Sequence, residues 1–264
     1  MADFLSVRGV SRSFPSSAPG GAPTVALQAT DLTVAENDFI TILGPSGCGK
    51  STLLRIVAGL DHQTSGEVLL DGRRIEGPGA DRGMVFQSYT LFPWLTVRDN
   101  VCFGLRERGL PRSQQLEVAQ AFLKKVGLTG FENHYPKQLS GGMQQRTAIA
   151  RALANGPRML LMDEPFGALD HQTREQMQEL LLGIWEAERK TVLFVTHDID
   201  EAVFMGSRVI VMSARPGRIK LNREVALSHP RSYAVKTTPA FVALKAELTE
   251  QVRTEVLAAQ AAMA

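Results

Sequence analysis

The residues best suited to chemistry form a glycine-rich loop that ends in lysine, serine and threonine. The loop consists of Gly44, Pro45, Ser46, Gly47, Cys48, Gly49, Lys50, Ser51 and Thr52. Its glycines allow the backbone to turn its amides inward around phosphate oxygens. Lys50 could reach the β- and γ-phosphates of a nucleotide, and the Ser51 hydroxyl could bind Mg²⁺. The pattern therefore indicates a phosphate-binding loop.

The residues on either side predict the strand and the helix that such a loop requires. Residues 39–43 (FITIL) form a short apolar run, and residues 53–58 (LLRIVA) begin an apolar helix. A helix N-terminus adds N–H groups and the positive end of a dipole. A plain glycine turn is the alternative, but chance gives the bare pattern in roughly one chain per hundred of this length. We therefore expect the chain to bind a nucleoside triphosphate.

Two adjacent carboxylates follow another apolar run. Residues 159–162 (MLLM) are typical of a strand buried on both faces, and Asp163 and Glu164 come next. Carboxylates at the end of a buried strand are costly unless they serve a function. In a nucleotide-binding protein, Asp163 suits Mg²⁺ coordination and Glu164 suits activation of the attacking water.

A histidine follows a further apolar strand at residues 191–195 (TVLFV). A lone histidine such as His197 is usually structural. However, parallel α/β sheets place ligands at the carboxyl ends of their strands, which is where the glycine-rich loop and Asp163 also occur. This shared position favours a role for His197 at the nucleotide.

Small residues also precede a helix in the middle of the chain. Ser140, Gly141 and Gly142 come before a segment with helical apolar spacing that ends near Asn155. A glycine-rich helix cap is the simplest interpretation. The alternative is a second anion site, because a hydroxyl and exposed amides at a helix start suit phosphate.

The composition is that of a globular α/β protein with a balanced charge. Of 264 residues, 44% are apolar, and 29 Lys and Arg stand against 27 Asp and Glu, so nucleic acid is not expected as a main partner. The sequence predicts neither a signal peptide nor a membrane span. The two cysteines, Cys48 and Cys102, do not suggest a disulfide framework, which favours a reducing, cytoplasmic compartment.

The N-terminal part predicts a β hairpin. Phe4–Val7 and residues 27–34 alternate like antiparallel edge strands, and Pro15–Pro23 is a loop of proline, glycine and serine at the hairpin tip. Phe14 lies just before this loop. Its ring could stack on adenine, although an aromatic residue at a strand end more often belongs to the core.

The middle of the chain predicts two short strands, an aromatic loop and a block of helices. Strands are expected at residues 65–72 and 83–86, and helices are expected over 96–105, from 113 to 126, after Ser140 and after Asp170. The loop at 88–97 carries Tyr89, Phe92 and Trp94. These aromatic residues either belong to the core or line a docking groove for a partner.

Taken together, these segments resemble the ATP-binding subunit of an ABC transporter over residues 4–227. GPSGCGKST is similar to the Walker A motif, LSGGM to the signature motif, LLMDEP to the Walker B motif and GALD to the D-loop. Gln87 corresponds to the glutamine of the Q-loop, and His197 to the switch histidine.

The resemblance implies how ATP would be bound. Phe14 would stack on adenine, and the loop at residues 44–52 would hold the phosphates. Ser140, Gly141 and Gly142 would complete the site of the opposite subunit in a head-to-tail homodimer. Phe14 departs from the family pattern, which usually has tyrosine there.

The resemblance also implies how ATP would be hydrolysed. Ser51, Gln87 and Asp163 would hold Mg²⁺, and Gln87 would help to position the attacking water. Glu164 would be the general base, and His197 would contact the γ-phosphate.

A narrower resemblance concerns the branch that imports nitrate, sulfonates, taurine and bicarbonate. It rests on LSGGMQQR, where Met143 replaces the usual glutamine, on LFPWLTVRDNV, and on the tail from about Pro230. The chain would then be an ATPase that energises import through two separate permease subunits and, indirectly, a solute-binding protein. It would lie at the cytoplasmic face of the inner (plasma) membrane as a peripheral protein.

The expected fold is an α/β P-loop NTPase of the ABC ATPase type, with a mixed central sheet, an antiparallel β subdomain and a helical subdomain at about 88–156. The ATPase domain would span residues 1–227, and residues 228–264 would form a short helical tail. The tail's apolar stripe comprises Phe241, Leu244, Leu248, Val252 and Val256. The alternative functions are a non-transport ABC ATPase acting on nucleic acid, the ATPase of an exporter, and a nucleotide-binding switch without transport.

Overall fold

The computed structural model describes residues 3–16 and 20–261, which fall into two compact units. The first unit contains the described residues up to Gly79 and those from Thr191 onward, and the second contains Ala80–Lys190. Part of the predicted loop at Pro15–Pro23, residues 17–19, lies outside the described residues.

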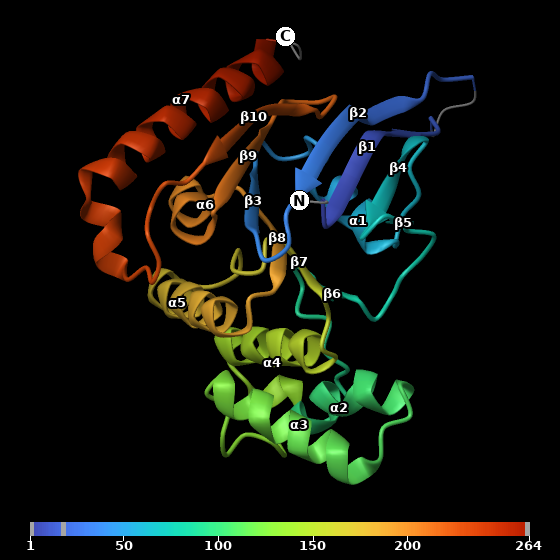
Figure 1. Cartoon of the computed structure of the whole chain (residues 1–264), viewed down its shortest axis with the longest axis vertical. Coiled ribbons are helices and arrows are strands. Elements are labelled where there is room, and N and C mark those ends of the chain that lie inside the picture. The colour runs from blue at the N-terminus through green and yellow to red at the C-terminus, as the bar shows by residue number, and fades with distance from the viewer. Residues whose placement is uncertain (1–2, 17–19, 262–264) are drawn as a thin grey trace. The chain divides into compact units, whose positions relative to one another are not determined.

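The first unit contains an antiparallel sheet in the order β2-β1-β4-β5 (Figure 1). Its strands are β1 (Leu5–Phe14), β2 (Thr24–Val34), β4 (Ser65–Leu70) and β5 (Arg73–Arg74). The hairpin prediction is confirmed, because β1 and β2 pair antiparallel. The prediction of an edge strand at Phe4–Val7 is wrong, because Leu5 pairs with Val34 on one side and with Leu70 on the other.

The same unit contains four strands of a mixed sheet in the order β10-β9-β3-β8. They are β3 (Phe39–Leu43), β8 (Thr191–Thr196), β9 (Arg208–Met212) and β10 (Ile219–Glu224). Strand β3 runs parallel to both β8 and β9, whereas β10 is antiparallel to β9. Every residue of β3 and β8 is buried, as expected for strands that are covered on both faces.

The helices of this unit are α1 (Lys50–Ala58), α6 (Ile199–Met205) and α7 (Pro239–Ala261), with a 3₁₀ turn at Tyr233–Thr237. Helix α7 packs against α6, and its Phe241, Leu244 and Leu248 are buried. The predicted stripe does not continue to the end of the helix, because Val256 is 37% exposed.

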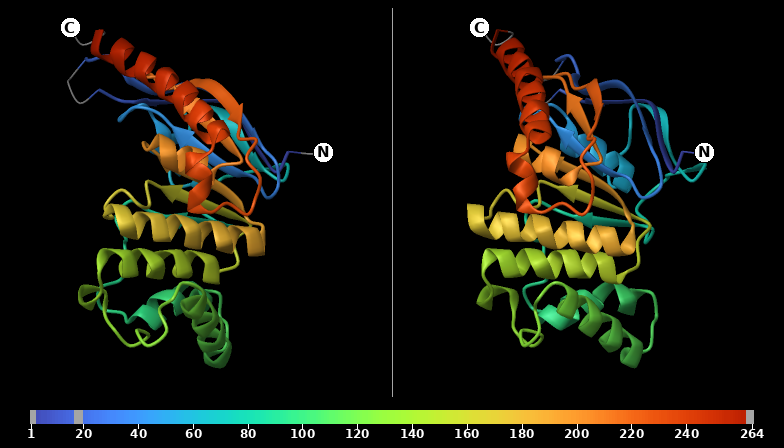
Figure 2. Two further views of the ribbon diagram at one scale, coloured as in Figure 1. Left: turned by 90° about the vertical axis from the view of Figure 1, so that its left-hand side faces the viewer. Right: turned by 60° about the vertical axis from the view of Figure 1, so that its left-hand side comes forward.

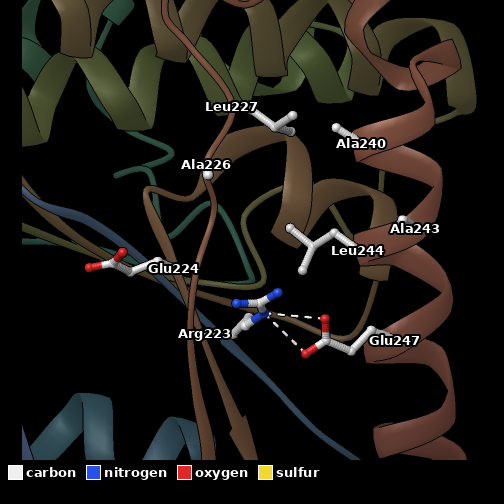
Figure 3. Close-up of a pocket in the computed structure, with 8 residues that line it drawn as sticks. All are labelled: Arg223, Glu224, Ala226, Leu227, Ala240, Ala243, Leu244 and Glu247. Atoms are coloured by element: carbon white, nitrogen blue, oxygen red, sulfur yellow. Dashed lines mark hydrogen bonds and ion pairs between the residues drawn. The ribbon is translucent and has the colours of Figure 1, made fainter.

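A small groove separates α7 from β10 and the chain that follows it. It is lined by Arg223, Glu224, Ala226, Leu227, Ala240, Ala243, Leu244 and Glu247 (Figure 3). Arg223 on β10 and Glu247 on α7 join across it, with Arg223 Nε 3.0 Å from Glu247 Oε1. No predicted site residue lines this groove, so it belongs to the packing of the tail.

The second unit contains a pair of parallel strands and four α-helices. The elements are β6 (Arg82–Val85), β7 (Met159–Asp163), α2 (Val97–Glu107), α3 (Arg112–Lys125), α4 (Gly141–Ala154) and α5 (His171–Glu188), with a 3₁₀ turn at Pro136–Gln138. Helix α4 lies beside α5, and α2 and α3 also pack on α4 (Figure 2). The helices predicted in this region are confirmed.

Side chains cap the starts of two helices in this unit. The Asp99 N–H donates to Thr96 Oγ1 at 3.1 Å where α2 begins, and the Thr173 N–H donates to Asp170 Oδ1 at 3.0 Å where α5 begins. These side chains satisfy amides that have no partner within the helix.

None of the helices formed by residues 3–16 and 20–261 has the length and apolarity needed to cross a bilayer.

Candidate active site

The glycine-rich loop connects β3 to α1, as predicted. Gly47 and Gly49 have φ angles of 74° and 100°, values that residues with a side chain rarely adopt. A Cβ atom on Gly49 would lie 2.9 Å from the Ala26 carbonyl oxygen, which is too close for any other residue. Gly49 is also the N-cap of α1 and has no side chain to bond its first amides. The start of α1 therefore suits an anion.

Lys50 folds back over this loop. Only 4% of Lys50 is exposed, and its Nζ donates to the carbonyl oxygens of Gly44 at 2.9 Å and of Pro45 at 3.0 Å. Backbone carbonyls thus solvate an ammonium group that burial would otherwise destabilise. A bound phosphate could take over as its partner.

The carboxyl ends of β3 and β8 bring a second predicted site residue to the same sheet edge. Leu43 pairs with Thr196, so His197 follows β8 where Gly44 follows β3. His197 is exposed. The next residue, Asp198, caps α6 by accepting a hydrogen bond from the Glu201 N–H at 3.0 Å. The sequence-based expectation that the loop and His197 share an edge is confirmed.

Phe14 lies at the end of β1, and it is 37% exposed rather than part of the core. The guanidinium carbon of Arg12 lies 4.5 Å from the centre of the Phe14 ring. Arg12 is held in turn by Asp61, with Arg12 Nη2 2.7 Å from Asp61 Oδ1. A cation already stacks on this ring, and a flat, polarisable group is the other kind of partner that such a ring accepts.

In the second unit, Asp163 ends β7 and Glu164 begins the turn that follows. Both are partly exposed. Glu164 has a φ angle of 43°, in the left-handed region that is uncommon for residues other than glycine. The Gly167 N–H donates to the Glu164 carbonyl oxygen at 3.2 Å and closes the turn. Such backbone strain at a carboxylate is typical of functional sites.

Ser140 caps α4, because its Oγ accepts a hydrogen bond from the Met143 N–H at 3.3 Å. The two glycines that follow are tightly enclosed. A Cβ atom on Gly141 would lie 2.9 Å from the Tyr89 hydroxyl, and one on Gly142 would lie 2.6 Å from Thr173 Cγ2. Burial raises the pKa of Tyr89. Residues with side chains at 141 and 142 would thus disturb the start of α4.

The segment after Gln87 divides its aromatic residues between packing and exposure. Gln87 itself is exposed. The Phe92 ring centre lies 4.4 Å from that of Phe103 on α2, so Phe92 packs against this helix, although both residues are only half-buried. Trp94 is 71% exposed. A large exposed indole favours the docking interpretation for this position.

Sequence reasoning did not identify Arg151, which ties this segment to α4. Its Nη1 donates to the Thr90 carbonyl oxygen at 2.8 Å, and its Nη2 donates to Thr90 Oγ1 at 3.0 Å. Burial lowers the pKa of Arg151. Arg151 lies between Ala150 and Ala152, which are both buried. Its position could have indicated that the guanidinium has hydrogen-bond partners, because a cation on an apolar helix face requires them.

The oxygen donors predicted for Mg²⁺ suit that ion. Ser51 supplies a hydroxyl in the first turn of α1, and Asp163 supplies a carboxylate at the end of β7. Mg²⁺ is usually bound through one or two protein oxygens together with phosphate oxygens and waters. The part of the chain that the structure describes contains no group of three or more His, Cys, Asp or Glu able to hold a metal ion. Ser51 and Asp163 each offer an oxygen of the kind that Mg²⁺ binds.

Comparison with known proteins identifies the family of the chain. The family model for ABC transporters matches residues 27–167. The chain is 49% identical over 237 residues to the nitrate import ATP-binding protein of Synechocystis sp., covering 87% of this chain and 88% of that protein. It is 51% identical over 233 residues to the taurine import ATP-binding protein of Escherichia coli, covering 86% and 90%.

A solved structure is similar throughout its length. It is described as the dimeric structure of a post-hydrolysis state of an ATP-binding cassette bound to ADP and Pi. Its TM-score to this chain is 0.75 at 36% identity, covering 85% of this chain and all of that one. Together with the phosphate-binding loop and His197 at one sheet edge, these similarities establish that the chain belongs to the ABC transporter family, as an ATP-hydrolysing subunit with the ABC ATPase fold.

Proposed function

We propose that this chain hydrolyses ATP to drive import of a small solute of the nitrate, sulfonate, taurine or bicarbonate type through separate membrane subunits. The observation that carries the proposal is an identity of about half over nearly the whole length of two import ATPases. The chain would lie at the cytoplasmic face of the membrane, bound to its permease.

ATP would bind with its phosphates in the loop at residues 44–52. The Lys50 ammonium would exchange the Gly44 and Pro45 carbonyl oxygens for β- and γ-phosphate oxygens, an exchange that keeps the buried cation satisfied. Adenine would stack on the Phe14 ring, one face of which already carries the Arg12 guanidinium.

Hydrolysis requires a base and a way to stabilise the charge that develops on the γ-phosphate. Ser51, Gln87 and Asp163 would hold Mg²⁺, which neutralises charge on the β- and γ-phosphates when it is bound. Glu164 would accept a proton from the attacking water, and His197 would contact the γ-phosphate.

We further propose that Ser140, Gly141 and Gly142 act on the nucleotide of a second copy in a head-to-tail homodimer. The position of Ser140 and the two glycines at the start of α4 supports this role, because the N–H groups and the dipole of a helix N-terminus favour an anion. The similarity to a cassette described as dimeric and bound to ADP and Pi also supports it.

The shared site is tested by mixing two inactive variants, Lys50→Ala and Ser140→Arg. In a head-to-tail dimer, one site of the mixed dimer receives both lesions and the other site is intact, so ATPase activity should return. The control mixes wild type with the Lys50→Ala, Ser140→Arg double variant, whose mixed dimer has no intact shared site. The shared site would be contradicted if the mixed dimer of the control hydrolysed ATP and the mixed dimer of Lys50→Ala with Ser140→Arg did not.

Transport is tested by copurifying the membrane partner and reconstituting the complex in vesicles with its solute-binding protein. Nitrate, taurine, another sulfonate or bicarbonate should stimulate ATP hydrolysis and accumulate in the vesicle interior. Trp94→Ala should weaken assembly with the permease while the isolated subunit remains folded, because Trp94 is 71% exposed. Export of the solute would contradict the proposed import. Assembly that is unaffected by the loss of Trp94 would contradict the proposed docking role of this residue.

A further inference from the structure

The turn that joins β9 to β10, Ser213–Arg218, lies directly against the phosphate-binding loop. A Cβ atom on Gly217 would come within 1.8 Å of the Cys48 carbonyl oxygen. A Cβ atom on Gly44 would lie 3.0 Å from the carbonyl oxygen of Met212, which immediately precedes the turn. Two segments far apart in the sequence therefore touch through their backbones.

Hydrogen bonds to neighbouring elements hold this turn in place. The Gly217 N–H donates to the Ala26 carbonyl oxygen at 3.1 Å, and the Gln28 N–H donates to the Gly217 carbonyl oxygen at 2.8 Å, so the turn is attached to β2. The Ala214 N–H donates to Glu255 Oε2 of α7 at 2.9 Å. The turn is thus fixed from two sides.

A hydroxyl inside the turn fixes its shape as well. Ser213 Oγ accepts a hydrogen bond from the Arg218 N–H at 3.1 Å and lies 3.0 Å from the Ala214 carbonyl oxygen. Because the backbone of this turn is already fixed, little further conformational entropy is lost when one of its side chains binds a ligand.

The turn presents Arg215 to the loop. Arg215 Nη2 lies 3.9 Å from the position of a Cβ atom built on Gly47, and no other atom of the described residues outside its immediate chain neighbours comes within 4 Å of that position. Arg215 is exposed, and within the described part of the chain it makes no hydrogen bond or ion pair. Glu255, the carboxylate that accepts from the Ala214 N–H of this turn, is paired with Lys220 at 2.8 Å.

We propose that Arg215 is a further nucleotide-binding residue, whose guanidinium contacts the triphosphate of ATP held in the loop at residues 44–52. The proposal rests on ATP binding at this loop and adds a second cation to Lys50. Arginine suits this task because its planar fork of donors matches phosphate oxygens. Within the described residues no carboxylate pairs with Arg215, so its guanidinium can donate to the phosphate oxygens.

The experiment measures the Kd of Mg-ATP for the full chain by isothermal titration. Arg215→Ala should raise the Kd about tenfold, a usual effect of losing one charge-assisted hydrogen bond. Arg215→Lys keeps the charge and should raise it less. Arg218→Ala is the matched control, because Arg218 lies on the same turn but outside the 4 Å surroundings of Gly47.

The salt dependence and the folding of each variant complete the test. The ratio of the Mg-ATP Kd values of Arg215→Ala and Arg218→Ala should approach one as the salt concentration is raised from about 0.05 to about 0.5 M, because salt screens a partly exposed cation. Circular dichroism establishes that each variant is folded, and Arg215→Gln replaces the alanine variant if that one unfolds. Equal Kd values for the Arg215 and Arg218 variants would overturn the proposal and leave the proposed function intact. A wild-type chain that does not bind Mg-ATP would overturn both.

Discussion

Arg231 provides a test of what holds the helix after His197 in place. It is only 6% exposed, and its Nη1 approaches three carbonyl oxygens at the end of α6, those of Val203 at 3.1 Å, Phe204 at 3.0 Å and Gly206 at 2.8 Å. Its Nη2 donates to the Leu227 carbonyl oxygen at 3.0 Å. One cation therefore satisfies the carbonyl groups that end a helix and attaches the tail to it.

We expect Arg231→Met to destabilise the protein by about 3 kcal/mol. Methionine keeps most of the stem but leaves buried carbonyl groups without a donor, and a hydrogen bond to a charged group contributes about 1.5–3 kcal/mol. The loss of several such bonds is partly offset, because the variant no longer has to dehydrate a guanidinium group. In a chain of this size the loss corresponds to a fall of roughly 6–12 °C in Tm.

Urea and thermal unfolding, followed by circular dichroism, measure this loss. Arg223→Met is the matched control, because Arg223 forms an ion pair with Glu247 but its side chain is 47% exposed, and exposed pairs contribute about 0–1 kcal/mol. The reasoning is refuted if Arg231→Met and Arg223→Met differ by less than about 1 kcal/mol, which is the upper range for an exposed pair.

Three further predictions concern the active site and the tail. Glu164→Gln should bind ATP normally but hydrolyse it about 10²–10⁴ times more slowly, because the amide keeps the shape and loses the base; near-normal turnover would remove Glu164 from that role. Mg-ATP should slow the reaction of Cys48 with a maleimide, because Cys48 belongs to the loop that would wrap the phosphates and bound nucleotide would shield its thiol, whereas Cys102 on α2 should show no protection; inactivation that persists in Cys48→Ser would argue against this. Burial raises the pKa of Glu255, but hydrogen bonds from Lys220 and a backbone amide outweigh it, so the pKa lies below its ordinary value. The free energy of unfolding of Glu255→Gln should therefore be lower than that of wild type, and this difference should be largest above about pH 4.3, the usual pKa of glutamate. The difference should disappear as the pH falls through the lower pKa of the folded state; a difference that grows in acid would contradict this.

The sequence predicted best what depends on residues close together in the chain. The loop at 44–52, the cap at Ser140 and the strand end at Asp163 are local patterns, and the structure contains each of these elements where it was expected. The shared edge of Gly44 and His197 was also predictable, because it follows from a general rule of parallel sheets.

What could not be predicted depends on pairing between distant segments. The alternation at Phe4–Val7 suits a strand but does not give the number of its neighbours, so the position of β1 between β2 and β4 was missed. Arg215 reads as an ordinary exposed arginine until the turn around it is placed against Gly47. Likewise, Val256 continues the apolar spacing of α7, but the surface that would cover it ends earlier.

The pairing of β3 has a consequence for the chain as it is synthesised. This apolar strand leaves the ribosome early, but its two neighbours in the sheet, β8 and β9, begin at Thr191 and Arg208. At about 5–20 residues per second, the strand waits roughly 10–30 s for either partner. The nascent chain thus carries an unpaired apolar segment for most of its synthesis, which makes β3 the segment for which we expect protection by a chaperone to matter most.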